Sequence, residues 1–148
     1  MDDTTPPPLV SPGDKRVLIV DDDPLIRDLL ELAVSAEGFQ VVMAKEGVEA
    51  TTRLAERPFD LIITDLMMPG ENGYDFMRKL AGAGAGRVPI VVVTASHLDP
   101  STVAMIKQDA KVVEFLTKPI KMSLLILALH RELKTIPPEN RSRGLNDR

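Results

Sequence analysis

The 148-residue sequence contains no cysteine, which excludes disulfide bonds and thiolate metal sites. It also lacks an excess of basic residues, because 18 Lys and Arg stand against 22 Asp and Glu. The resulting net charge of −4 argues against direct binding to nucleic acid. No stretch approaches the roughly 20 apolar residues of a membrane span, and no basic segment followed by an apolar run marks a signal peptide. We therefore expect a cytoplasmic protein.

The composition that is present is typical of one globular domain, with 44% hydrophobic and 27% charged residues. The two ends differ from the middle. Residues 1–14 hold four prolines without apolar periodicity, which predicts a disordered lead. Pro137 and Pro138 stop any helix near the other end, so residues 135–148 are predicted to be a polar tail. The predicted folded domain spans residues 15–134.

Five short apolar runs in this domain alternate with helical patterns. The runs that predict strands are Arg16–Val20, Gln40–Ala44, Asp60–Thr64, Ile90–Val93 and Val112–Thr117. The predicted helices cover residues 24–37, with Asp23 as N-cap and Gly38 as terminator, then Glu46–Glu56, Tyr74–Leu80, Ser101–Ala110 and Met122–Leu133. Strands that alternate with helices indicate an α/β fold whose parallel sheet is covered on both faces.

Polar residues follow several of the predicted strands. Asp21, Asp22 and Asp23 follow the first, and Asp65 follows the bulky run of the third. Each has an ordinary explanation, because Asp is common in turns and helix caps. In open parallel sheets, however, ligand sites form where the strands end, so these carboxylates are expected to meet there.

The fourth strand ends at Thr94, and Thr117 and Lys118 end the fifth. Clustered carboxylates repel one another unless a cation joins them, and Mg²⁺ prefers a few carboxylates plus waters and phosphate oxygens. A carboxylate can also accept a phosphoryl group, whose oxygens a Lys and a hydroxyl would hold. The combined pattern therefore predicts magnesium-dependent phosphoryl chemistry.

Four stretches together resemble the receiver domain of bacterial response regulators. They are VLIVDDDP at 17–24, LIITDLMMPGENG at 61–73, VVVTA at 91–95 and FLTKP at 115–119. The resemblance covers about residues 15–134. It implies a flavodoxin-like (βα)5 fold, a doubly wound parallel sheet of five strands in the order 2-1-3-4-5. It also implies a histidine kinase or phosphotransfer protein as phosphoryl donor and an output protein that the sequence does not name.

The resemblance assigns Asp65 as the phosphoacceptor beside a Mg²⁺ ion. Asp65, Asp22 and the backbone carbonyl of Met67 would be direct ligands of the metal, and Asp21 would support it through water.

The resemblance also assigns Thr94 and Lys118 as the residues that contact the phosphoryl group. Phe115 occupies the aromatic position that changes rotamer together with Thr94 on activation, and the Lys118–Pro119 bond is expected to be cis.

The sequence departs from the family in two places. Thr94 and Lys118 are 24 positions apart, about two more than in typical relatives, and Lys111-Val112 stands where a Gly-Ala pair is usual. Residues 81–86, AGAGAG, predict either a flexible loop or an extension of the third helix.

Two alternatives stay open. A small phosphatase resembling the haloacid dehalogenases would use Asp21 as nucleophile and Asp23 as acid, but Leu25 does not fit that motif and Asp65 would be unexplained. A pseudo-receiver would keep the fold and serve only for protein contacts. No second domain is recognised in the sequence, so it is expected to be a stand-alone receiver or a piece of a longer regulator.

Overall fold

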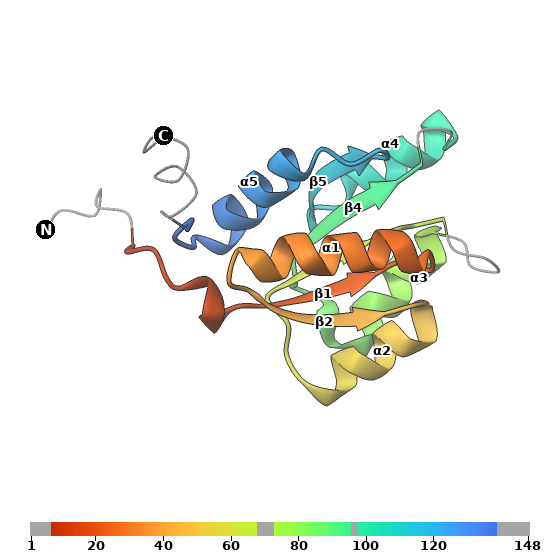
Figure 1. The fold of residues 1–148 in the computed structure, drawn as a ribbon. Coiled ribbons are helices and arrows are strands. Elements are labelled where there is room, and N and C mark those ends of the chain that lie inside the picture. The colour runs from red at the N-terminus through yellow and green to blue at the C-terminus, as the bar shows by residue number, and fades with distance from the viewer. Residues whose placement is uncertain (1–6, 68–72, 96–97, 139–148) are drawn as a thin grey trace, which may run out of the picture.

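The computed structural model describes residues 7–67, 73–95 and 98–138. Five parallel strands form one sheet in the order β2-β1-β3-β4-β5 (Figure 1). Their bounds are β1 Arg16–Val20, β2 Gln40–Ala44, β3 Leu61–Thr64, β4 Ile90–Thr94 and β5 Val112–Thr117. The predicted flavodoxin-like fold and strand order are confirmed.

Helices cover both faces of the sheet. Their bounds are α1 Pro24–Ala36, α2 Gly47–Glu56, α3 Gly73–Leu80, α4 Pro100–Gln108 and α5 Met122–Leu133. The helices α1 and α5 pack on one face, whereas α2, α3 and α4 pack on the other (Figure 1). None of the helices in the described ranges is long and apolar enough to cross a membrane.

The apolar strands alternate between two cores. In β1, Val17 and Ile19 join the cluster under α1 and α5, whereas Leu18 and Val20 join the cluster on the opposite face. All four are buried, because successive side chains of a strand point to opposite faces and both faces here carry helices. This double burial explains why the strands are almost continuous apolar runs.

The turn after β1 begins helix α1 as predicted. The Asp23 side chain accepts a hydrogen bond from the Leu25 N–H at 2.9 Å, and Pro24 occupies the first helical position. Gly38 follows the helix with a φ of 103°, a left-handed conformation that favours glycine.

Some element boundaries differ from the prediction. Asp60 lies just before β3 instead of starting it. Its backbone N–H donates to the Arg16 carbonyl at 2.8 Å, and its Oδ2 accepts the Arg16 N–H at 2.8 Å. The Ala-rich segment Ala81–Ala85 continues α3 as a π-helical turn with Gly84 at a φ of 105°. Of the two predicted conformations, the structure therefore contains the helical extension.

The segment between Thr94 and Lys118, which the sequence predicts to be longer than in typical relatives, contains an irregularity in β5. The register pairs Ile90 with Val112 but Val91 with Glu114, so Val113 is an additional residue in β5. Helix α4 ends at Gln108, two residues before the predicted end. The Lys118–Pro119 peptide bond is cis, as the resemblance implied.

Both ends of the predicted domain extend further than expected. Ser11 caps a 3-10 turn at Pro12–Asp14, within the segment predicted to be a disordered lead. The Val10 N–H donates to Lys134 at 3.0 Å, and the Ile136 N–H donates to Val10 at 3.0 Å. Val10 therefore pairs with the segment that follows α5, and Gly13 accepts a hydrogen bond from the Gln40 side chain at 2.7 Å. Composition alone does not reveal these contacts, because most of them join backbone groups.

Candidate functional site

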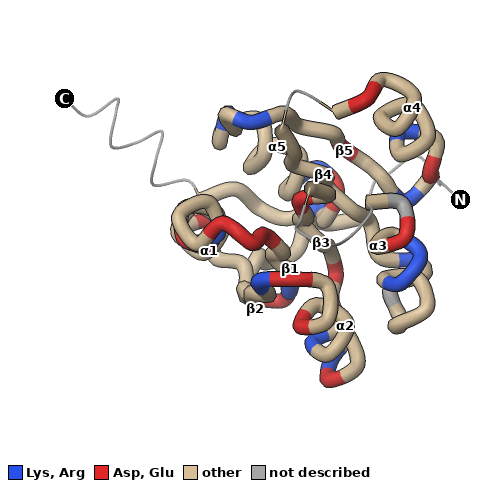
Figure 2. The backbone as a smooth tube through the Cα atoms, turned by 90° about the vertical axis from the view of Figure 1, so that its right-hand side faces the viewer, with Lys and Arg blue, Asp and Glu red and all other residues tan. Residues whose placement is uncertain are grey.

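Charged side chains that follow three separate strands meet where the strands end. Figure 2 marks the acidic and basic positions along the backbone. The Lys118 Nζ lies 2.8 Å from Oδ2 of Asp65 and 3.1 Å from Oδ2 of Asp21. Asp21 follows β1, Asp65 follows β3 and Lys118 follows β5. Asp21 and Asp65 are only 1% and 4% exposed. The structure thus brings together groups that are up to 97 positions apart in the chain.

Asp65 is the first residue after β3, and its backbone still forms a hydrogen bond to the neighbouring strand. Its N–H donates to the Val20 carbonyl at 3.0 Å. Its Oδ1 accepts the Met67 N–H at 2.8 Å, while Oδ2 accepts from Lys118. The chain therefore holds the Asp65 carboxylate at the strand end through both of its oxygens.

Asp21 is held by similar bonds. Its Oδ1 accepts the Asp23 N–H at 2.9 Å, and its backbone carbonyl accepts from the Arg27 guanidinium at 2.8 Å. Burial raises the pKa of Asp21 above its usual value, although the hydrogen bonds from Asp23 and Lys118 oppose that rise. The carboxylate of Asp21 is therefore ionised at a cost in free energy.

Lys118 balances part of this negative charge. Partial burial alone would lower the pKa of Lys118, but the bonds and charges of Asp65 and Asp21 outweigh it, so the pKa is raised. The ammonium group therefore stays protonated at neutral pH.

Three carboxylates lie close together in this site, and the Lys118 ammonium contacts two of them. Oxygens of Asp21, Asp22 and Asp65 all lie within 4.8 Å of one another, and Asp22 is exposed. This all-oxygen set suits a hard cation such as Mg²⁺, and a carboxylate oxygen that accepts one hydrogen bond keeps a second lone pair for a metal. The residues present therefore fit a magnesium ion. The carbonyl of Met67 remains a predicted ligand.

Thr94 ends β4 beside this cluster, and Phe115 lies on the neighbouring strand β5. The Thr94 carbonyl accepts the Lys118 N–H at 2.8 Å, which places Thr94 next to the charged site. Thr94 is fully buried, and its Oγ1 has no hydrogen-bond partner among the described residues. A buried hydroxyl without a partner is costly, so this oxygen is available to a ligand. Phe115 is partly buried.

The pKa of Asp21 leads to a stability prediction for the metal-free protein. Below pH 3.8 the carboxyl of Asp21 is protonated in the folded and the unfolded chain, so Asp21→Asn should change the free energy of unfolding little. At neutral pH the ionised form is disfavoured only in the folded chain, so the variant should be more stable than the wild type. Urea unfolding at both pH values in EDTA measures this, and a variant less stable at neutral pH would contradict it.

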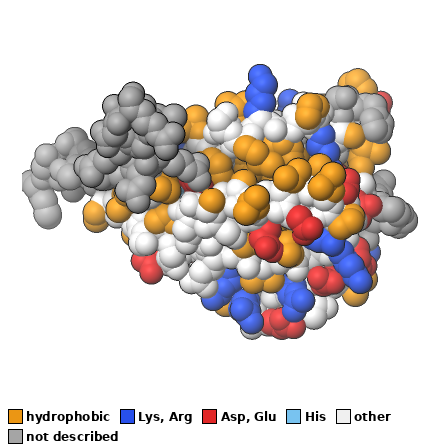
Figure 3. Space-filling view, in the orientation of Figure 1, with side chains coloured by type: hydrophobic (Ala, Val, Ile, Leu, Met, Phe, Trp, Pro, Cys, Tyr) orange, Lys and Arg blue, Asp and Glu red, His pale blue; other side chains and the backbone are white. Residues whose placement is uncertain are grey.

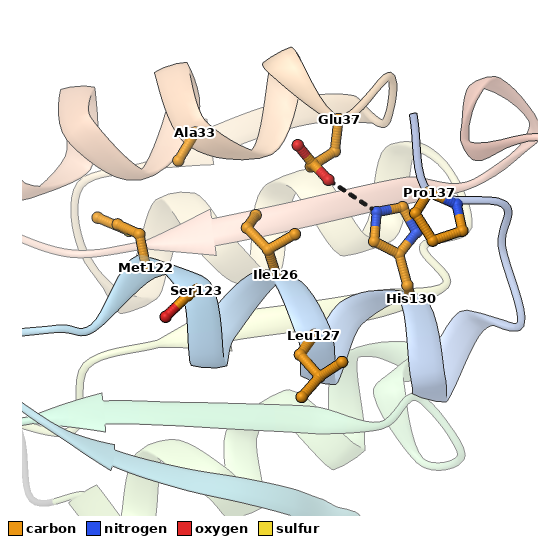
Figure 4. Close-up of a pocket in the computed structure, with 8 residues that line it drawn as sticks. All are labelled: Ala33, Glu37, Met122, Ser123, Ile126, Leu127, His130 and Pro137. Carbon is orange, nitrogen blue, oxygen red and sulfur yellow. Dashed lines mark hydrogen bonds and ion pairs between the residues drawn. The ribbon is translucent and has the colours of Figure 1, made fainter. Parts of the chain in front are cut away.

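A second buried polar cluster lies far from the strand ends. His130 of α5 has Nε2 at 2.9 Å from Glu37 Oε1 and Nδ1 at 2.7 Å from Thr135 Oγ1. The cluster borders a pocket of about 450 Å³ between α1 and α5 (Figure 4). Glu37 precedes β2, so these residues lie near the starts of the strands. The sequence analysis did not identify this cluster; its one sequence signal is a His on the apolar face of α5.

Comparison with known proteins identifies the family. The sequence model of the response regulator receiver domain matches residues 17–130. The chain belongs to the response regulator receiver family. It is 33% identical over 130 residues to response regulator MprA of Mycobacterium tuberculosis, covering 88% of this chain and 55% of MprA. It is 35% identical over 120 residues to the DNA-binding response regulator MtrA of Mycolicibacterium smegmatis, covering 81% of this chain and 51% of MtrA. The chain thus spans about half the length of these curated relatives.

Solved structures agree with this assignment. A response regulator receiver protein from Pseudomonas putida matches with a TM-score of 0.74 and 30% identity, covering 79% of this chain and 96% of that one. A sensor protein from Polaromonas sp. JS666 matches with a TM-score of 0.72 and 34% identity, covering 81% and 96%. Receiver domains of this kind belong to two-component systems. Membership of the family therefore assigns this chain the general role of a receiver domain.

Proposed function

We propose that this receiver domain accepts a phosphoryl group on Asp65 from the phosphohistidine of a histidine kinase or phosphotransfer protein. The observation that carries the proposal is the Asp65 carboxylate, buried at a strand end and bonded to Lys118 beside two further carboxylates. An oxygen of Asp65 attacks the phosphorus, a P–O bond forms, and the P–N bond to the donor imidazole breaks. The electron pair of that bond stays on the imidazole nitrogen.

The surrounding residues would hold the transferred group. Lys118 already contacts the Asp65 oxygen at 2.8 Å, so its ammonium can follow the developing charge onto a phosphoryl oxygen. The Thr94 hydroxyl has an unused hydrogen bond to donate. Asp21, Asp22 and Asp65 would hold Mg²⁺, which supplies positive charge that offsets the repulsion between carboxylates and phosphoryl oxygens.

Helix α1 offers a surface for the phosphohistidine donor. It begins directly after Asp22 and Asp23, and it exposes Leu25, Leu29 and Leu32 by 66%, 44% and 70%. Their spacing of four and three residues places them on one side of the helix. Figure 3 shows hydrophobic side chains gathered on the face that carries α1. A donor that reaches Asp65 would cover this side of α1, because exposed apolar surface beside a reactive group is typical of a partner contact.

The output would pass from Thr94 to Phe115. A phosphoryl group on Asp65 would draw the Thr94 hydroxyl toward it, and the vacated space would admit the Phe115 ring. That movement would change the surface formed by α4, β5 and α5, and with it the affinity for an output protein in the cytoplasm. MtrA is described as DNA-binding, but this chain matches only about half of MtrA, so the output partner is not assigned.

The dehalogenase-like alternative has less support. Its proposed acid, Asp23, uses its carboxylate to cap α1 by accepting the Leu25 N–H. Both carboxylate oxygens of Asp21 already accept hydrogen bonds, one from the Asp23 N–H and one from the Lys118 ammonium.

Magnesium should stabilise the folded protein. At about ten times its dissociation constant, Mg²⁺ should add ~1.4 kcal/mol to the free energy of unfolding, because it binds the native site and not the unfolded chain. Thermal unfolding with and without Mg²⁺ measures this as a rise in Tm. Asp22→Asn should lose most of the rise, since Asp22 is an exposed member of the cluster whose replacement disturbs little packing.

Asp28→Asn on the exposed side of α1 is the matched control and should keep the full rise. A wild-type Tm that does not respond to millimolar Mg²⁺ would refute the metal site.

A further inference from the structure

Lys107 of α4 lies over the ring of Phe115. Its Nζ is 5.1 Å from the ring centroid, which is within the range of a cation–π interaction. Both residues border a surface pocket of about 310 Å³ beside the edge strand β5. Among the described residues, Lys107 forms no hydrogen bond or ion pair, so the ring of Phe115 is the polarisable group that its ammonium faces.

The sheet register connects this contact to the charged site. Phe115 pairs with Val92, and Thr94 is two residues further along the same strand. Side chains two positions apart on a strand share a face, so Thr94 and Phe115 are diagonal neighbours on the α4 side of the sheet. Phe115 also packs against the core cluster that contains Val92 and Ile106, and Ile106 directly precedes Lys107. Helix α4 therefore contacts the Phe115 ring through Lys107 and packs against the core through Ile106.

We propose that Lys107 is a positioning residue that holds the Phe115 ring in its present orientation and so opposes the switch. The proposal rests on the proposed function of Asp65, Thr94 and Phe115. A ring that turns toward Thr94 leaves the ammonium of Lys107 without its aromatic partner. The contact therefore stabilises only the resting orientation, and its loss should shift the equilibrium toward the turned ring by roughly two- to five-fold.

Binding of a phosphoryl mimic reports that shift. When the resting state is dominant, an interaction that stabilises it lowers the affinity for a ligand that prefers the other state by nearly the same factor. Lys107→Met keeps the aliphatic stem and removes the charge. We expect it to bind beryllofluoride, in the presence of Mg²⁺, about two- to five-fold more tightly than the wild type. The NMR signal of the Thr94 methyl group in the free variant should also move toward its position in the beryllofluoride complex.

Two control variants separate the charge from a general effect on the helix. Lys107→Arg keeps a cation over the ring and should bind beryllofluoride like the wild type. Lys121→Met removes an exposed charge that caps no helix by its side chain, and it should also behave like the wild type. Equal affinities of Lys107→Met and wild type would overturn the proposal, and so would equal shifts in Lys107→Met and Lys107→Arg.

A failure of the proposed function would look different. In that case the wild type itself would not bind beryllofluoride, whereas Lys107 could still position the ring. The free proteins then decide the matter, because Lys107→Met must change the ring-current shifts that Phe115 imposes on the Val92 methyl groups and Lys107→Arg must not. Unchanged shifts in Lys107→Met would overturn the role of Lys107 independently of phosphorylation.

Discussion

Asp65→Asn should abolish phosphoryl uptake from acetyl phosphate in the presence of Mg²⁺. The amide has almost the shape of the carboxylate, so the fold should survive, and Lys118 keeps its contact with Asp21 at 3.1 Å. A neutral amide oxygen is a far weaker nucleophile toward phosphorus, so no stable phosphoryl adduct should form. Intact-protein mass spectrometry measures the fraction of protein that carries the added phosphoryl mass.

Asp23→Asn is the matched control. Asn is as good a helix cap as Asp, and Asp23 is exposed, so this variant should still be phosphorylated. Phosphoryl uptake by Asp65→Asn together with its loss in Asp23→Asn would support the phosphatase alternative and exclude Asp65 as the acceptor.

Replacing Leu25 and Leu29 with Ser should slow phosphotransfer from a phosphorylated histidine kinase by about tenfold or more. That factor corresponds to ~1.4 kcal/mol of lost contact, a modest loss for two exposed leucines at a partner surface. Uptake from acetyl phosphate should stay unchanged, because a small donor reaches Asp65 without covering α1. The ratio of the two rates separates damage to docking from damage to the site.

Val48→Ser provides the comparison for this surface. Val48 is 68% exposed on α2, which packs on the other face of the sheet, so both rates should match the wild type. A double Leu variant that slows both donors equally would show that α1 affects the site itself, and one that slows neither would remove α1 from the donor surface.

Much of the site could be predicted because its residues follow strands that are easy to recognise. Asp21 and Asp65 come directly after apolar runs, and parallel strands end at the same edge, so their meeting follows from topology. The strand order itself came from the family resemblance, since alternating helices and strands do not determine it. The roles of these residues in phosphoryl transfer and metal binding stay predictions.

Other features depend on packing that no local pattern encodes. The contact between Lys107 and Phe115 depends on the angle at which α4 crosses β5. It also depends on the pairing register of β4 and β5, which shifts at Val113. Val10 pairs with Thr135, although composition predicted a disordered lead and a polar tail for the two segments that contain them. This pairing is formed by backbone hydrogen bonds, which almost any residue type can make, so the sequence does not indicate it.

The segment that follows α3 was predicted to be either a flexible loop or an extension of the helix. Alanine favours helix and glycine disfavours it, so Ala81–Ala85 was consistent with either a helix or a loop. The structure continues the helix as a π turn, and Gly84 within this turn adopts the positive φ of a kink. Propensity alone could not decide, because three alanines favour the helix and two glycines oppose it.

The location of the phosphoryl group on the wild-type protein tests the central claim most directly. Incubation with acetyl phosphate and Mg²⁺, reduction of the acyl phosphate with borohydride and peptide mass spectrometry would identify the modified residue as homoserine. The proposal predicts that homoserine replaces Asp65 and no other aspartate, and only when Mg²⁺ is present. Homoserine at position 21, or no conversion at any aspartate, would contradict it.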